Sequence, residues 1–306
     1  MSSLFAFPGQ GAQQVGMLHR LPDGAGQLLE EASDTLGQSA LGLDSQEALQ
    51  GTRAVQLCLL LSGVAWARWL MQRSPAPDYV AGLSIGAYPA AVAAGALGFA
   101  DAVRLVALRG ELMQCAYPHG YGMTALSGLD LASVERLLRA VGGEVYVANL
   151  NSENQIVIAG SEAAMAAVAR RARSLGQGVA RRLAVSVPSH CPLLAGPAAE
   201  LAKAFATVEL RRPAITYLSG SSARPIFDTQ RLRDDLAGNM AQVVDWRATL
   251  RNAYERGVRL HLEIPPGSVL SGLARPVFEQ GRVVSVEGTR PDTLDALLRQ
   301  EVAQNG

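Results

Sequence analysis

A serine framed by glycines, in the segment GLSIG at residues 82–86, restricts the fold of this chain more than any other feature. The apolar run YVAGL at 79–83 leads into it, and an alanine-rich segment of high helix propensity follows from Tyr88 to Ala96. This order predicts a strand, a sharp turn and a helix. It is the only G-x-S-x-G in the chain, and in this context the pattern lifts a serine hydroxyl out of a sheet. The alternative is an ordinary glycine-rich turn.

Strands and helices alternate along much of the remaining sequence. Strand-like LFAF at 4–7 ends at Pro8-Gly9. Asp101 is a candidate N-cap for a helix over 102–116, because its side-chain oxygen can accept from exposed first-turn amides. Alternation predicts an α/β fold with a mostly parallel sheet covered on both faces. The other expected elements are helices at 53–72, 193–206 and 229–256, strands at 215–220 and 259–264, and a turn at 265–272.

The pattern changes between about residues 121 and 185. Strands are expected at 122–128, 144–150, 155–160 and 178–184, with helices at 131–141 and 162–176. This β-α-β-β-α-β order is typical of a small ferredoxin-like unit. We therefore expect a large domain formed by residues 1–120 and 186–306, with a ferredoxin-like subdomain inserted at 121–185.

Composition excludes several classes of protein. A chain of 306 residues that is 49% hydrophobic and 18% charged is globular and not disordered. With 27 basic and 27 acidic residues, no electrostatic surface for nucleic acid or anionic lipid is expected. Three cysteines without metal-ligand spacing predict neither a disulfide framework nor a metal site, and fit a reducing, cytoplasmic setting.

Two apolar segments raise the question of targeting or membrane insertion. The amino-terminal residues have no basic region, so we expect no signal peptide. Residues 79–100 carry no charge over 22 positions, which is long enough to span a membrane. Because they are mostly alanine and glycine, with Ser84 and Pro89 among them, we interpret them as buried core and expect no membrane partner.

A nucleophilic serine needs a base, and the best candidate is His190. It lies in VPSHCP at 187–192, where two prolines favour a rigid loop that can hold an imidazole in one orientation. The alternative is a loop histidine satisfied by its neighbours. Cys191 is rejected as a nucleophile because it lacks a sharp turn of its own, and adjacent side chains on extended backbone point apart. His19, His119 and His261 suit a surface position, a turn and a strand.

The loop after the first strand, FPGQGAQ at 7–13, has glycines on both sides of Gln10. They allow its backbone amide to approach a ligand closely. The loop lacks the glycine spacings of a nucleotide phosphate cradle.

Together these segments resemble the malonyl-CoA:acyl carrier protein transacylase family. The resemblance spans nearly the whole chain. It implies an α/β-hydrolase-like large domain and a Ser–His dyad in place of a triad. The matching segments are FPGQGAQ at 7–13, GLSIGAYPAAVAAG at 82–95, RGELMQ at 109–114, VPSHCPLL at 187–194 and EIPPGSVLSGL at 263–273.

The resemblance also implies roles for individual residues. Ser84 matches the nucleophile and His190 its base. The amides of Gln10 and Ile85 match the oxyanion hole. Asn239 lies where the family places Gln or Asn, whose main-chain carbonyl orients the histidine.

Arg109 matches the arginine that pairs with the free carboxylate of the malonyl group. The match is chemically reasonable, because guanidinium and carboxylate form a fork of two hydrogen bonds. The alternative is a solvated helix arginine. Met113 is one helical turn beyond it and is a candidate for shaping the acyl pocket.

The sequence departs from the bacterial fatty-acid enzymes, which usually read G-H-S-L-G-E, by having Leu83 and Ala87. The segment after FPGQGAQQVGM is also short. These features are similar to the malonate decarboxylase epsilon subunit, which loads malonyl onto a carrier with a phosphoribosyl-dephospho-CoA arm. The resemblance then implies ping-pong transfer from malonyl-CoA to a carrier thiol, with coenzyme A as leaving group and no bound metal or redox cofactor.

Three rival interpretations stay open. The first is the malonyl-loading enzyme of fatty acid synthesis, with the same chemistry and a different carrier. The second is an α/β-hydrolase esterase, although no acidic residue between Ser84 and His190 stands out as a third triad member. The third is a catalytically silent scaffold in a multi-subunit complex.

Overall fold

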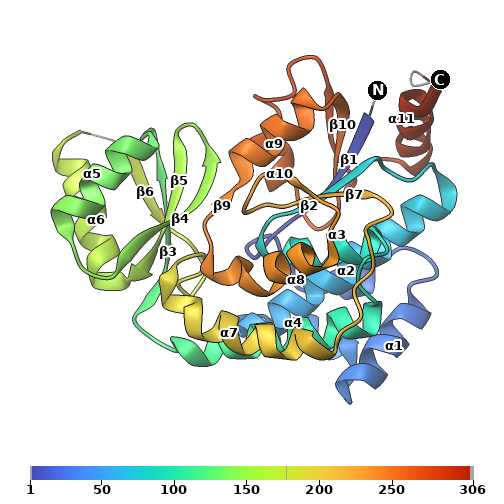
Figure 1. Cartoon of the computed structure of the whole chain (residues 1–306), viewed down its shortest axis with the longest axis horizontal. Coiled ribbons are helices and arrows are strands. Elements are labelled where there is room, and N and C mark those ends of the chain that lie inside the picture. The colour runs from blue at the N-terminus through green and yellow to red at the C-terminus, as the bar shows by residue number, and fades with distance from the viewer. Residues whose placement is uncertain (1, 177, 304–306) are drawn as a thin grey trace.

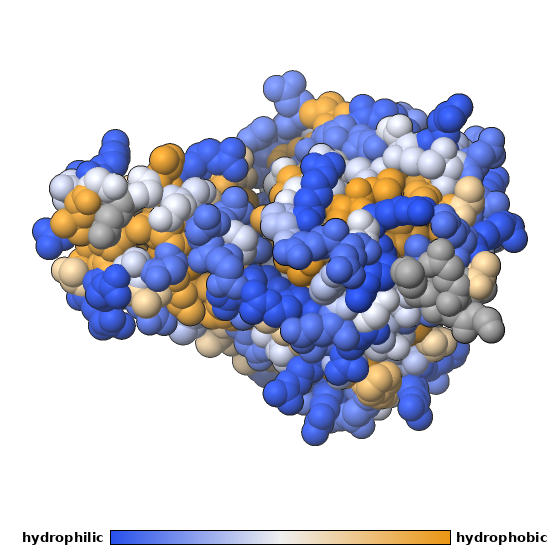
Figure 2. Space-filling model, turned by 90° about the horizontal axis from the view of Figure 1, so that it is seen from above, coloured by the Kyte–Doolittle hydropathy of each residue, from blue (hydrophilic) through white to orange (hydrophobic). Residues whose placement is uncertain are grey.

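A computed structural model describes residues 2–176 and 178–303. Residues 1, 177 and 304–306 of the expected domains lie outside the described part. Figure 1 shows a larger body and a smaller lobe, each built on its own sheet. Figure 2 shows the lobe standing out from the body, with hydrophobic and hydrophilic residues on the visible face.

The larger sheet has the strand order β11-β10-β1-β2-β7-β8. Neighbours are parallel except β7 and β8, which are antiparallel. The mostly parallel sheet is thus confirmed. Its strands are β1 (Ser2–Phe7), β2 (Tyr79–Gly82), β7 (Thr216–Leu218), β8 (Pro225–Ile226), β10 (Val258–Glu263) and β11 (Arg282–Ser285).

Strand β1 shows why this sheet is covered on both faces. Its side chains alternate in direction. Phe5 and Phe7 pack with one set of helices, while Leu4 and Ala6 pack with another. The first set includes α2 (Thr52–Arg73), α3 (Ala87–Ala93), α4 (Phe99–Ala116), α7 (Ala195–Ala204), α8 (Thr229–Gly238) and α11 (Pro291–Ala303), and the second α9 (Trp246–Glu255) and α10 (Val269–Ala274).

Helix α2 is long and apolar enough to cross a membrane, and 78% of its most apolar window is buried inside the molecule. It is the one helix of this kind among the described residues. That burial is typical of a core helix. In the segment 79–100, Val80, Ala90 and Leu97 are likewise buried, as expected for core.

The smaller sheet has the order β6-β3-β5-β4-β9. Its elements β3, α5, β4, β5, α6 and β6 follow the predicted β-α-β-β-α-β order. Strand β9 (Val244–Asp245) pairs parallel with β4, so the chain after the insertion adds an edge strand that sequence analysis missed. The domain boundaries stay predictions. The bounds are β3 (Tyr121–Ser127), α5 (Leu131–Val141), β4 (Val145–Ser152), β5 (Gln155–Ser161), α6 (Glu162–Ser174) and β6 (Val179–Arg182).

Two local predictions were wrong. The expected helix over 229–256 is two helices, α8 and α9, because Asp245 accepts from the Ala248 amide and starts a new helix there. Asp101 does not cap α4, because the helix already begins at Phe99 and Asp101 lies inside its first turn. Its carboxylate instead accepts from Arg104 at 2.7 Å.

The remaining elements are short connections and one helix. They are α1 (Gly26–Leu36) and the 3-10 turns η1 (Met17–Arg20), η2 (Ala40–Asp44), η3 (Ala48–Gln50), η4 (Ser84–Gly86), η5 (Pro192–Leu194), η6 (Phe205–Thr207) and η7 (Asn239–Ala241). None of these was anticipated, and neither were β8, β11 and α11. The segment 265–272 was expected to be a turn, but α10 begins within it at Val269.

Candidate active site

Ser84 lies at the sharp turn between β2 and α3. Its φ is 57°, in the left-handed region that disfavours residues with a Cβ. The two flanking glycines permit this turn, because a Cβ on Gly82 would overlap the backbone of Gly86, and one on Gly86 would overlap the carbonyl of Phe7. The chain therefore packs too closely here for any larger residue.

His190 reaches this serine from the loop that precedes η5. Its Nε2 is 2.7 Å from Ser84 Oγ. The residue has a φ of 64°, and its backbone amide donates to Met240 O at 2.7 Å. The loop thus fixes the backbone as well as the imidazole, and the expected serine–histidine pairing is present.

Carbonyl oxygens determine which imidazole nitrogen carries the proton. Nδ1 lies 2.8 Å from Asn239 O and 3.2 Å from Gln242 O. Because a carbonyl only accepts, Nδ1 must donate, which leaves the Nε2 lone pair free to accept from Ser84. Burial, helped by the nearby cation of Arg109, lowers the pKa of His190 to about 4. At neutral pH the imidazole is therefore an uncharged base.

Arg109, on α4, is completely buried behind the serine. Its Nη1 donates to Gln56 Oε1 at 2.7 Å, and its Nη2 to Asn239 Oδ1 at 3.1 Å. Nη2 also lies 3.4 Å from Ser84 Oγ. Burial lowers the pKa of Arg109 to about 10, so the guanidinium stays charged at neutral pH. The alternative of a solvated helix arginine is therefore excluded.

This buried cation has no protein counter-ion. All three of its acceptors are uncharged, and no ion pair within the described ranges includes Arg109. Its Nε is buried without a hydrogen-bond partner. An unpaired buried charge is costly. The arrangement is therefore typical of a site that receives an anion.

Asn239 has a side-chain role that sequence analysis missed. Besides accepting from Arg109, its Nδ2 donates to Ser84 O at 3.3 Å. Gln56 on α2 was missed altogether. The one available signal was a polar residue in the middle of an apolar helix, where it is buried. Met113 is buried too, and its Sδ accepts from Gln56 Nε2 at 3.3 Å, so it touches the partner of the arginine.

A cavity of about 680 Å³ opens in front of the serine, between the two sheets. Ser84 and His190 line it, whereas Arg109 and Met113 do not. Its walls come from the loop after β1, from β3 to β6 and from α10. The other lining residues include Gln10, Leu83, Met123, Asn149, Gln155, Arg181, Arg182, Val269 and Leu273.

The two predicted oxyanion residues are Gln10 and Ile85. Gln10 lines the cavity, and its neighbour Gly9 packs so closely on Leu83 that a Cβ there would lie 2.8 Å from Leu83 O. Ile85 follows Ser84 in the first turn of η4, where amides have no carbonyl of an earlier turn to bind. Their assignment as an oxyanion hole stays a prediction.

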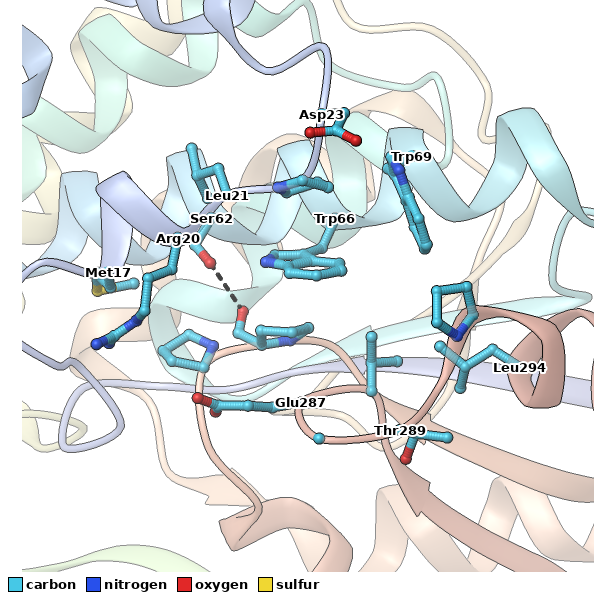
Figure 3. A pocket seen from close by; sticks show the side chains of 16 residues that line it. Met17, Arg20, Leu21, Asp23, Ser62, Trp66, Trp69, Glu287, Thr289 and Leu294 are labelled. Carbon is cyan, nitrogen blue, oxygen red and sulfur yellow. Dashed lines mark hydrogen bonds between the residues drawn. The ribbon is translucent and has the colours of Figure 1, made fainter.

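The turn before α10 is held from the side opposite the cavity. Figure 3 shows Ser62 donating to a main-chain oxygen of this turn, Pro265 O, at 3.2 Å. A second cavity of about 400 Å³, lined by Trp66 and Trp69 of α2, lies on that side. Helix α2 thus supports both the arginine, through Gln56, and a wall of the main cavity.

Fold and site together define a class of protein. An α/β chain with a serine on a glycine-framed turn, bonded to a neutral histidine, has the arrangement of enzymes that form covalent acyl intermediates. The sequence profile of the acyl transferase domain family matches residues 4–305. The chain belongs to this family and is an acyltransferase.

Relatives resemble the chain over almost its full length. The malonyl CoA-acyl carrier protein transacylase of Salmonella typhimurium is 36% identical over 97% of this chain and 98% of its own. The corresponding structure from Coxiella burnetii has a TM-score of 0.91 at 32% identity, covering 98% of each chain. A malonyl-transacylase in complex with a type II PKS acyl-carrier protein has a TM-score of 0.91 at 35% identity, covering 98% of this chain and 100% of its own.

Proposed function

We propose that this acyltransferase moves a malonyl group from malonyl-CoA to the thiol of an acyl carrier protein. The observation that carries the proposal is the buried, unpaired guanidinium of Arg109, 3.4 Å from Ser84 Oγ. An acyl group on that oxygen would bring a terminal carboxylate next to the cation. Malonyl has such a carboxylate and acetyl does not.

The first half-reaction forms the acyl-enzyme. Ser84 Oγ attacks the thioester carbonyl while its proton moves to His190 Nε2. The amides of Gln10 and Ile85 stabilise the oxyanion of the tetrahedral intermediate. When this intermediate collapses, the carbon–sulfur bond breaks and coenzyme A leaves as a thiol with the proton from His190. The Asn239 carbonyl stabilises the imidazolium that forms between these steps.

The second half-reaction reverses these roles. The carrier thiol gives its proton to His190 Nε2 and attacks the ester carbon of malonyl-Ser84. Collapse of the second intermediate returns the proton to Ser84 Oγ and releases malonyl carrier protein. No metal ion or bound cofactor enters either step.

The proposal also concerns which carrier protein accepts the malonyl group. The relatives described above carry the name malonyl CoA-acyl carrier protein transacylase or malonyl-transacylase. They favour an ordinary acyl carrier protein as acceptor, in the manner of fatty acid synthesis, over the malonate decarboxylase carrier favoured by Leu83 and Ala87. We also propose a cytoplasmic location, where coenzyme A thioesters and carrier proteins meet.

One experiment tests both the malonyl transfer and the identity of the carrier. The protein is given labelled malonyl-CoA with a carrier bearing ordinary phosphopantetheine, or with one bearing the phosphoribosyl-extended arm. Faster labelling of the first supports the carrier proposed here, and faster labelling of the second assigns the chain to malonate decarboxylase. Label released as free malonate without a carrier would indicate an esterase. Absence of turnover with either carrier would indicate a scaffold.

A further inference from the structure

We propose that Gln56 and Asn239 form a neutral carboxamide clamp that keeps Arg109 without a counter-ion, and so determine which acyl group the enzyme accepts. This inference rests on the proposed function. It adds to that function two residues that need not touch the substrate. They are positioning and specificity residues that act through the arginine.

The clamp holds the guanidinium from two sides. Gln56 Oε1 accepts from Nη1, and Asn239 Oδ1 accepts from Nη2. The two carboxamides come from α2 and η7, on different parts of the chain, and both are buried. Each is itself held, by Met113 Sδ and by Ser84 O. The orientation of the guanidinium is therefore fixed before a substrate arrives.

One edge of the guanidinium is left for a ligand. Nε and Nη2 form the side of the group that can bind a carboxylate with two parallel hydrogen bonds. The clamp takes Nη1 and one N–H of Nη2. Nε stays buried without a partner, and Nη2 also donates to Ser84 Oγ, the oxygen that would carry the acyl group.

The clamp is also uncharged, although carboxylates of the same size would fit. Glu and Asp have nearly the shapes of Gln and Asn and would give the buried cation a partner. Such a partner would satisfy the arginine permanently and would repel a second carboxylate in the same dry site. Amides orient Arg109 without neutralising it, so its charge stays available to the substrate.

The test is Gln56→Glu, which changes the charge of the clamp and almost nothing of its shape. The measured quantity is the ratio of kcat/KM for malonyl-CoA to that for acetyl-CoA, with one carrier protein. We expect the ratio to fall by roughly 10²- to 10³-fold. We expect the melting temperature to hold or rise, because the buried cation gains a partner. Structural damage would lower it.

Two controls separate charge from shape. Gln56→Met has a side chain of similar length without charge or oxygen, and should lower the ratio less than about tenfold, the worth of an ordinary hydrogen bond. Gln50→Glu makes the same change of charge at an exposed position of η3 and should leave the ratio unaltered. If Gln56→Met lowers the ratio as much as Gln56→Glu, the charge of the clamp is not what matters, and the proposal is overturned.

Binding provides a readout apart from turnover. In a Ser84→Ala background, the preference in Kd for malonyl-CoA over acetyl-CoA should disappear when Gln56→Glu is added. If Gln56→Glu fails to fold, Asn239→Asp places the carboxylate on the other side of the arginine and should give the same loss of preference. An unchanged preference in the variant that folds overturns the proposal.

The outcomes of these experiments distinguish failure of the clamp from failure of the proposed malonyl transfer. If the wild-type enzyme prefers malonyl, Arg109→Ala abolishes that preference and Gln56→Glu does not, the clamp is wrong and the function stands. If the wild-type enzyme shows no malonyl preference, the proposed function itself fails and the clamp fails with it.

Discussion

Ser84 and His190 are both in the left-handed backbone conformation, with φ values of 57° and 64°, and their side chains meet at 2.7 Å. Such a conformation costs a residue with a Cβ about 1 to 2 kcal/mol. Both residues of the pair are held there by their surroundings. The glycines of the turn fix the serine, and the bond from the His190 amide to Met240 O fixes the histidine.

Substitution Ser84→Ala should abolish covalent malonylation, because no other hydroxyl occupies the turn. Intact-protein mass spectrometry after incubation with malonyl-CoA checks this directly. The matched control is Ser189→Ala, since Ser189 also lines the cavity and should leave malonylation in place. A malonyl mass on the Ser84→Ala protein would show that another residue is the nucleophile.

His190→Ala should lower the rate of acylation by about 10²- to 10⁴-fold, the usual contribution of a general base. Binding of malonyl-CoA should change far less, because the imidazole contacts the serine and not the anion-binding side of Arg109. Stopped-flow measurement of acylation, with Kd measured separately in the Ser84→Ala background, separates the two effects. Near-normal acylation would remove His190 from the mechanism.

Acid should inactivate the enzyme only at low pH. The pKa of His190 is about 4, so its neutral form persists at pH 5 and is lost as the pH falls through about 4. Arg109 contributes to this depression, second to burial. In Arg109→Ala, the acid limb of kcat/KM for acetyl-CoA should therefore move to higher pH. A limb at the same pH in both proteins would contradict the coupling between the arginine and the histidine.

The reacting pair could be predicted from sequence because it depends on local backbone signals. A G-x-S-x-G after a strand predicts a sharp turn that exposes the serine, and a histidine between prolines predicts a rigid loop. The clamp could not be predicted in this way. Gln56 and Asn239 meet Arg109 only after α2, α4 and η7 have packed, and no spacing along the chain encodes that meeting.

The same distinction applies to the fold: elements encoded by the local sequence were predicted, and elements set by tertiary packing were not. Short apolar runs ending at glycine or proline were enough to predict β1 and β2, and the pattern of apolar segments gave the order of elements in the smaller lobe. This pattern missed β9, two residues long, whose pairing with β4 is set by tertiary packing. The sequence pattern also predicted α8 and α9 as one helix, because it did not reveal that Asp245 caps the start of a new helix.

His261→Leu should stabilise the protein, most clearly in acid. His261 is fully buried on β10, and neither ring nitrogen has a hydrogen-bond partner. Burial lowers its pKa to about 4. Below about pH 6.5 His261 is protonated in the unfolded chain but stays neutral in the folded chain. The free energy of unfolding therefore falls as the pH drops from about 6.5 to 4.

The loss from this one histidine is on the order of 3 kcal/mol across that window. Urea denaturation of both proteins at pH 7 and pH 4.5 measures it. His190 titrates in the same window but is present in both proteins, so the difference isolates His261. Equal acid sensitivity in the two proteins would show that His261 is protonated in the folded state.

Arg109→Ala is the decisive substitution for the choice of acyl group. If the guanidinium pairs with the malonyl carboxylate in a dry site, its removal leaves that anion unpaired at a cost of about 3 to 5 kcal/mol. This is roughly two to four decades of kcat/KM for malonyl-CoA. Acetyl-CoA has no carboxylate, so its transfer should fall little or rise, and the preference should reverse.

Arg109→Lys provides the matched control, because it keeps the charge and loses the fork. An ammonium cannot reproduce two parallel bonds to a carboxylate, nor reach Gln56 and Asn239 at once, so it should restore only part of the malonyl transfer. The measurement is transfer of both acyl groups to one carrier protein by the three proteins. Equal losses of malonyl and acetyl transfer in Arg109→Ala would mean that the arginine supports the packing around α4. A loss confined to malonyl, partly restored by lysine, would place the carboxylate of the substrate on the free edge of Arg109.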